Sequence, residues 1–231
     1  MNAECTPVKA PSETWFYILL GAYVGAWGLV SGLTPKLVPL DLGWLGMGML
    51  SFSYGVFIHG ITFPCADTVT EVWGPARARL MVYIGVVMYC VSILFYMVGT
   101  KLPPAPGWDL NAAYISIFAS AGRMIVGSVT ATIFAQLLDI LVFVRVKRMT
   151  GQKGLWIRNN LSTMVAQFAD ASIFYSIAFY GVIPTSEIPK LVFGTYLVKV
   201  LLSILGTPVV YLMVHRITGH WTARGDLVAG Q

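Results

Sequence analysis

Long apolar stretches with few or no charged residues, separated by short polar segments, dominate the chain. A helix needs about 20 mostly apolar residues to cross a hydrocarbon core that is roughly 30 Å thick. The pattern therefore predicts an all-α membrane protein, a bundle of six transmembrane helices. The expected spans cover residues 15–33, 43–63, 80–100, 113–144, 161–183 and 191–214. The span over residues 113–144 is too long for a perpendicular crossing, so we expect it to tilt or to project from the membrane.

Composition supports this interpretation, because 57% of the 231 residues are hydrophobic and only 11% are charged. Soluble domains carry about 25% charged residues, so this chain has too few to cover a soluble core. We expect residues 1–231 to form one integral membrane domain. The three cysteines show no C-x-x-C spacing, which argues against a disulfide framework and against a metal site. The uncharged run at 15–33 is longer than a signal-peptide core of about 7–15 residues, so we interpret it as the first span.

The distribution of basic residues predicts the orientation of the bundle, because cytoplasmic loops are enriched in Lys and Arg. Six spans place both termini on the same side of the membrane. Of the 15 basic residues, ten would fall on that side, three on the other, and Arg123 and Lys199 inside spans. The ten are Lys9, Arg77, Arg79, Arg145, Lys147, Arg148, Lys153, Arg158, Arg216 and Arg224, and the three are Lys36, Lys101 and Lys190. Both termini are therefore expected to be cytoplasmic.

Several ionisable residues lie where lipid would otherwise surround the chain. A charge at the centre of a membrane helix costs about 2.5–3.5 kcal/mol on insertion scales, so such residues face the bundle interior, a partner or a wet cavity. The candidates are Arg123, Asp139, Asp170 and Lys199 inside spans, and Asp67 and Glu71 just after Pro64. For Arg123 and Lys199 a purely structural pairing with these carboxylates stays open.

Two of these carboxylates belong to matching A-Q-x-x-D patterns, at residues 135–139 and 166–170. In each pattern the amide and the carboxylate are three residues apart, which places them on one helical face. Counted from the basic segment at 145–158, both patterns lie roughly 10–15 Å into the membrane, in neighbouring antiparallel helices. We therefore expect Gln136, Asp139, Gln167 and Asp170 to line one cavity. His59, in the second expected span, is interpreted as a packed, hydrogen-bonded histidine, with a proton relay as the alternative.

Three ordered motifs over about residues 60–215 resemble the queuosine precursor transporter family, which is also called the vitamin uptake transporter family. Pro64, Asp67, Glu71 and Gly74 are similar to its Pro-x-x-Asp-x-x-x-Glu-x-x-Gly motif. Its long central signature is similar to a set that runs from Arg123 to Phe179 and includes Gln136, Asp139, Phe143, Arg158, Asn160, Gln167, Asp170 and Ala178. Its last-helix motif resembles Tyr196, Lys199, Thr207, Pro208 and Tyr211.

The resemblance implies a multi-pass transporter of the bacterial inner membrane that imports a 7-deazaguanine such as preQ0, preQ1 or queuine. The resemblance implies that the protein is neither an enzyme nor a nucleic-acid-binding protein and that it needs no cofactor. Whether the carrier forms a homodimer stays open. The expected substrate-binding residues are Asp67, Glu71, Arg123, Gln136, Asp139, Asn160, Gln167, Asp170 and Lys199.

The chemistry of a 7-deazaguanine fits these side chains. Two adjacent N–H donors, from N1 and the exocyclic amine, match one carboxylate, and O6 requires a donor that an amide, Arg123 or Lys199 can supply. The flat face of the base would stack on an aromatic ring such as Phe63, Phe168 or Tyr196.

Two alternative functions stay open. The chain has no G-x-x-x-x-G-K-[ST] phosphate loop, so a substrate-binding subunit of a vitamin or nucleobase importer would need a separate ATPase module. An intramembrane enzyme with Asp139 and Asp170 as a dyad finds less support, because the chain has neither H-E-x-x-H nor G-x-S-x-G.

Overall fold

The computed structural model describes residues 12–43, 46, 48–118, 121–150 and 155–219, and most of them are helical. In chain order the elements are α1 (Glu13–Leu33), β1 (Leu37–Leu42), β2 (Gly48–Ser53), the 3-10 helix η2 (Tyr54–Ile58), α2 (His59–Trp73), α3 (Pro75–Gly99), α4 (Asn111–Phe118), α5 (Ala121–Thr150), α6 (Leu155–Phe179), the 3-10 helix η3 (Thr185–Glu187) and α7 (Ile188–Thr218).

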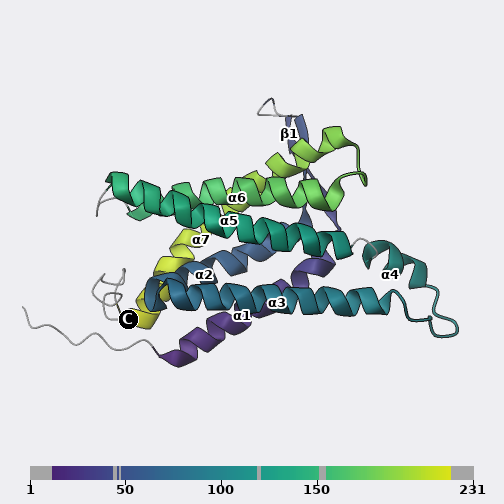
Figure 1. Ribbon diagram of the computed structural model, residues 1–231, viewed down its shortest axis with the longest axis horizontal. Helices are drawn as coiled ribbons and strands as arrows, with labels where there is room; N and C mark the ends of the chain where they lie inside the picture. Colours follow the sequence, from purple (N-terminus) through teal and green to yellow (C-terminus); the bar gives the residue numbers. More distant parts are fainter. Residues whose placement is uncertain (1–11, 44–45, 47, 119–120, 151–154, 220–231) are drawn as a thin grey trace, which may run out of the picture.

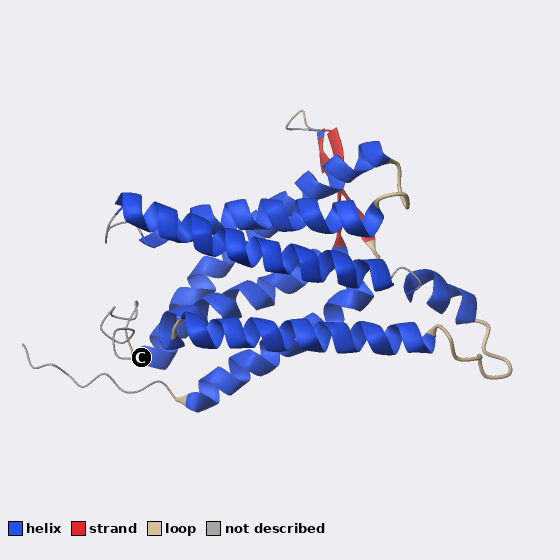
Figure 2. Cartoon of the chain, viewed as in Figure 1, coloured by secondary structure: helices blue, strands red, loops and turns tan. Residues whose placement is uncertain are grey.

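The six longest helices form two groups of three (Figure 1). Helices α1, α2 and α3 pack on one another. In the second group α6 packs on both α5 and α7, and contacts of α2 with α7 and of α3 with α5 join the groups. The helices alternate in direction, so the start of α1, the turn between α2 and α3, and the end of α7 lie at one end of the bundle. The β-hairpin and α4 lie at the opposite end (Figure 2).

The expected span over residues 43–63 is wrong as a continuous helix. Its first half belongs to an antiparallel hairpin, in which β1 and β2 pair from Leu37 opposite Ser53 to Leu42 opposite Gly48. Gly46 and Gly48 have φ angles of 72° and 68°, values that glycine adopts without strain, and they allow the chain to turn there. Hydrophobicity alone does not distinguish a short buried strand from a helix segment, so the sequence did not reveal this hairpin.

The expected span over residues 113–144 falls into two helices, α4 and α5, between which residues 119–120 lie outside the described part. Aromatic contacts hold α4 against the end of α3. The rings of Tyr96 and Phe118 stack with their centroids 4.4 Å apart. The described α4 segment comprises eight residues packed on the end of α3, and the expected tilt or projection of this span stays a prediction.

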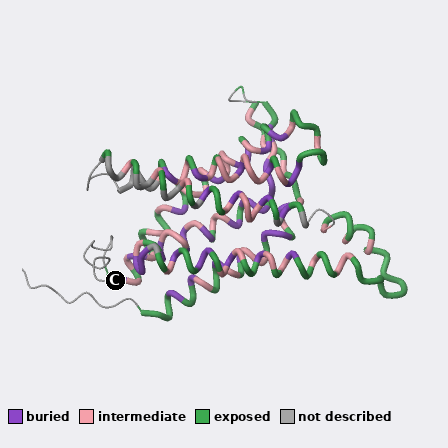
Figure 3. Tube along the Cα trace, in the orientation of Figure 1, coloured by how far each residue is buried: buried purple, intermediate pink, exposed green. Residues whose placement is uncertain are grey.

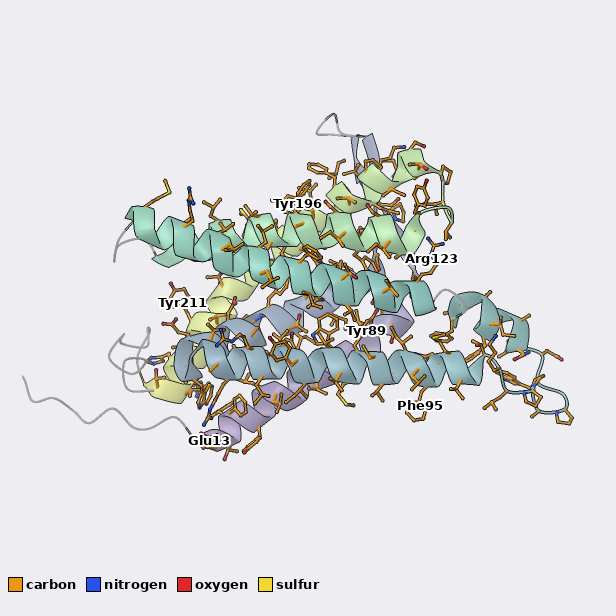
Figure 4. All side chains as sticks on the ribbon, viewed as in Figure 1. Glu13, Tyr89, Phe95, Arg123, Tyr196 and Tyr211 are labelled. Atoms are coloured by element: carbon orange, nitrogen blue, oxygen red, sulfur yellow. The ribbon has the colours of Figure 1, made fainter. Side chains whose placement is uncertain are left out.

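Three helical segments of the described chain are long and apolar enough to cross a membrane, namely Glu13–Leu33, Ala76–Gly99 and Thr185–Thr218. Much of the apolar surface of α3 points away from the other helices, and Phe95 is 73% exposed (Figures 3 and 4). Such a surface is typical of a helix that contacts lipid, because lipid tails are as apolar as the side chains. The number of six spans and the cytoplasmic termini stay predictions.

Candidate functional site

A cavity of about 660 Å³ lies between the two groups of helices. Its volume is within the range of about 300–1,000 Å³ that is usual for small-molecule sites. Every helix of both groups contributes to its wall, as does the hairpin end at Ser53. The polar and aromatic lining residues include Tyr23, Trp27, Thr34, Ser53, His59, Thr62, Phe63, Asp67, Thr70, Arg79, Ser128, Thr132, Thr163, Gln167, Asp170, Phe174, Tyr175, Thr195, Lys199 and Ser203.

A buried ion pair lies in the wall formed by α6 and α7. The Lys199 ammonium donates a hydrogen bond to Oδ2 of Asp170. The side chains are only 5% and 19% exposed, so the pair is largely removed from solvent. An ammonium and a carboxylate side by side present a donor next to an acceptor, and both face a cavity large enough for a flat heterocycle.

Gln167 lies one helical turn before Asp170 on the same face of α6 and also lines the cavity. Its Oε1 atom is buried and has no hydrogen-bond partner among the described residues. Buried polar atoms are nearly always paired, so an unpaired one in a cavity wall indicates a group that pairs with a ligand or with water. The sequence pattern correctly placed Gln167 and Asp170 together.

An aromatic wall faces the cavity from α1 and α2. The His59 ring stacks on Phe63, with centroids 4.8 Å apart and planes at 20°. Trp27 meets His59 edge-on at 6.4 Å. Phe63 was an expected stacking residue, whereas Trp27 was not considered and His59 was interpreted as a packing residue. The spacing of four residues between His59 and Phe63, which places both on one face of a helix, was the available signal.

The two carboxylates of α2, Asp67 and Glu71, differ in their position relative to the cavity. Asp67 lines the cavity, whereas Glu71, one turn later, is not among its lining residues. Asn160 lies beside a separate small pocket of about 10 Å³, to which Gln167 and Lys199 also contribute. Expected site residues Asp67, Gln167, Asp170 and Lys199 thus share one cavity, whereas Asn160 borders only the separate small pocket.

The remaining predicted partners on α5 cannot be placed in the same way. The side chains of Gln136 and Asp139 lie outside the described part of the structure, so their convergence with α6 stays a prediction. The described part of α5 that borders the cavity consists of Ser128, Ala131, Thr132 and Ala135. Ser128 also forms a hydrogen bond with Tyr89 of α3 at 3.0 Å, which joins the two helix groups (Figure 4).

Arg123 lies away from the cavity, at the end of the bundle where α5 begins (Figure 4). Its guanidinium donates to the carbonyl oxygens of Ile177, at 3.1 Å, and of Tyr180. The last carbonyls of a helix have no partner within the helix, so Arg123 satisfies the end of α6. Arg123 thus pairs with carbonyl groups rather than with a carboxylate, and its expected role in substrate binding stays a prediction.

Two aromatic residues that were expected to stack on the base also lie elsewhere. Phe168 and Tyr196 contact each other edge-on, with ring centroids 5.4 Å apart, and neither lines the cavity. Figure 4 places Tyr196 on the outer side of the bundle. Phe168 is the residue after Gln167, and its side chain is 48% exposed on the outside of the helix packing rather than turned to the cavity.

Comparison with known proteins assigns the family. A family model described as "Putative vitamin uptake transporter" matches residues 53–213 of this chain. The chain belongs to the vitamin uptake transporter family. This transporter is similar to a protein of Bacillus subtilis named "Probable queuosine precursor transporter", with 34% identity over 70% of this chain and 71% of that protein. A protein of the same name from Haemophilus influenzae is 27% identical over 63% of this chain and 61% of its own length.

No solved structure matches the chain. The family and the apolar helices make this protein a multi-pass bacterial membrane transporter, and not an enzyme. The matched range begins at Ser53, the last residue of β2, and ends within α7. It therefore includes Asp67, Gln167, Asp170 and Lys199.

Proposed function

We propose that this transporter imports a queuosine precursor, a 7-deazaguanine such as preQ0, preQ1 or queuine, and that the substrate binds in the cavity between the helix groups. The observation that carries the proposal is the Asp170–Lys199 pair, with the unpaired Oε1 of Gln167 beside it. The names of the two relatives support the same substrate class.

The chemistry of the pair matches one edge of the base. The Asp170 carboxylate can accept from N1–H and from the exocyclic amine, while the Lys199 ammonium donates to O6. The Gln167 amide supplies a further acceptor and donor next to them. On α2, which packs against α7, Phe63 and His59 line the same cavity and offer flat rings on which the base can stack.

Binding at this pair requires Lys199 and Asp170 to separate. Lys199 and Asp170 already satisfy each other, so a base that inserts its edge replaces one direct contact with contacts to both side chains. The base neutralises neither charge but accepts from the ammonium and donates to the carboxylate, so both charged groups keep hydrogen-bond partners.

A cellular experiment tests the proposed function. A bacterial strain that cannot synthesise queuosine precursors is grown with and without this gene on submicromolar preQ0, preQ1 or queuine, and queuosine is measured in its tRNA. We expect the gene to raise queuosine for at least one precursor, and the Asp170→Asn variant to abolish this gain while still accumulating in the membrane. No gain with any precursor would refute the proposal.

A further inference from the structure

The cavity differs between its two ends. Where the hairpin joins the bundle, the lining residues Thr34, Ser53 and Val56 are 6%, 3% and 3% exposed. Thr70 and Arg79, on either side of the turn between α2 and α3, are the exposed residues among the described part of the lining. That turn and the hairpin lie at opposite ends of the bundle (Figure 2). The cavity therefore reaches the surface at the α2–α3 turn and is closed at the hairpin end.

Hydrogen bonds at the closed end connect the two groups of helices. The Ser53 hydroxyl donates to the carbonyl oxygen of Thr34, the residue after α1, at 2.8 Å. In the other group the Thr195 hydroxyl of α7 donates to the Tyr175 hydroxyl of α6, also at 2.8 Å. The Tyr175 hydroxyl in turn interacts with Ser53. Ser53 thus links the end of α1 to α6 and α7, and all four residues line the cavity.

Two glycines bring the backbones at this end into close contact. A Cβ atom at Gly55 would lie 2.5 Å from Oγ1 of Thr34, and one at Gly194 of α7 would lie still closer to the carbonyl oxygen of Ser51. Side chains larger than hydrogen do not fit at such distances, so the close approach depends on glycine. Backbones packed in this way leave no passage for a flat heterocycle between them, so a substrate can cross this end only if the segments move apart.

We propose that Thr34, Ser53, Gly55, Tyr175 and Thr195, here called the hairpin junction, form the gate through which substrate enters the cavity from the hairpin side. A carrier exposes its site to one side of the membrane at a time, and this structure has the site open at the α2–α3 turn. In the orientation that the basic residues predict, the hairpin end faces away from the cytoplasm. The inference rests on the proposed function, because it takes the cavity as the substrate site.

Cysteine labelling in membrane vesicles of both orientations tests the gate. The native cysteines are replaced, and Thr132→Cys places one thiol in the cavity wall. Lys101→Cys, exposed in the turn after α3, shows which vesicles present the hairpin end to a membrane-impermeant maleimide. A minor conformational state is usually populated at about 10% or less. Thr132→Cys should therefore react about tenfold or more slowly from the hairpin side than from the side of the α2–α3 turn.

Two variants weaken the hairpin junction at different elements. Ser53→Ala and Thr195→Val each remove a hydroxyl that donates one of its hydrogen bonds. Loss of one typical hydrogen bond changes an equilibrium about fivefold, so labelling of Thr132→Cys from the hairpin side should accelerate by about that factor. Thr218→Val is the matched control, because Thr218 is another buried threonine of α7 with a hydroxyl that donates to a carbonyl, and it does not line the cavity. It should leave both rates unchanged.

Each outcome bears on the gate. Equal labelling of Thr132→Cys from both sides would refute the closure, and slow labelling from both sides would refute the open end at the α2–α3 turn. Thermal unfolding in detergent identifies variants that fold. If folded Ser53→Ala and Thr195→Val leave the hairpin-side rate unchanged, the hairpin junction is not the gate. Labelling requires no substrate, so these results are separate from failure of the proposed function, in which the purified protein binds no 7-deazaguanine.

Discussion

Replacing Asp170 and Lys199 separately and together distinguishes a substrate site from a structural ion pair. Lys199 is 4% exposed, and Asp170 is the acceptor that neutralises it. Asp170→Asn and Lys199→Met each leave one buried charge without its counter-ion. The double variant removes both charges and retains side chains of similar size.

The expected effects on folding follow from the cost of burying an unpaired charge. Removal of one partner of a buried pair typically costs about 3–5 kcal/mol, whereas replacement of both partners is often neutral or stabilising. Both single variants should therefore unfold at lower temperature than the unaltered protein. The double variant should regain most of that stability.

Substrate affinity should not follow stability. The amide in Asp170→Asn turns one acceptor toward the base into a donor, and loss of one charge-assisted hydrogen bond costs about 1.5–3 kcal/mol. Each 1.4 kcal/mol is a factor of ten, so affinity should fall roughly tenfold to a hundredfold or more. The double variant lacks both the carboxylate and the ammonium that are proposed to bind the base, so it should bind at least as weakly as either single variant.

The assay combines thermal unfolding in detergent with binding of radiolabelled 7-cyano-7-deazaguanine to the purified proteins. The informative protein is the double variant, because it separates the two roles. A double variant that is stable and binds the base like the unaltered protein would refute the substrate site, since the pair would then serve the fold alone.

Four further outcomes are expected. Gln167→Met should lower affinity about tenfold without loss of stability, because it removes a buried acceptor that has no described partner; unchanged binding would contradict this. Arg123→Met should lower the unfolding temperature and spare affinity, because Arg123 satisfies carbonyls of α6; lost affinity in a stable variant would argue otherwise. Gly194→Ala should cost about 1–3 kcal/mol of stability, since an added Cβ would lie 2.3 Å from the carbonyl oxygen of Ser51 in the hairpin; full stability would show that the hairpin shifts freely. Cysteines placed within residues 145–158 should react only with reagents that reach the cytoplasm, and labelling from outside would reverse the predicted orientation.

Most of the helical framework could be predicted because it depends on long apolar runs. The helices α1, α3, α6 and α7 overlap the spans expected at 15–33, 80–100, 161–183 and 191–214. The hairpin could not be predicted, because its strands are as apolar as a helix and pair through the backbone.

The site was partly predictable because helical spacing fixes which residues share a face. Gln167 and Asp170 share the cavity wall as their spacing required, and Lys199 joins them. The sequence could not show that Arg123 reaches the end of α6, because that contact depends on how two helices are offset along their axes. For the same reason it gave no means to choose His59 and Phe63 over Phe168 as aromatic residues of the cavity wall.

Uptake by the purified protein alone tests the central claim most directly. The transporter is reconstituted into liposomes, and accumulation of radiolabelled 7-cyano-7-deazaguanine is measured against empty liposomes and against liposomes that contain the Asp170→Asn and Lys199→Met double variant. We predict saturable uptake that requires the unaltered protein and that unlabelled preQ1 or queuine competes with. Folded, correctly inserted protein that takes up no more substrate than empty liposomes would contradict a self-sufficient 7-deazaguanine importer.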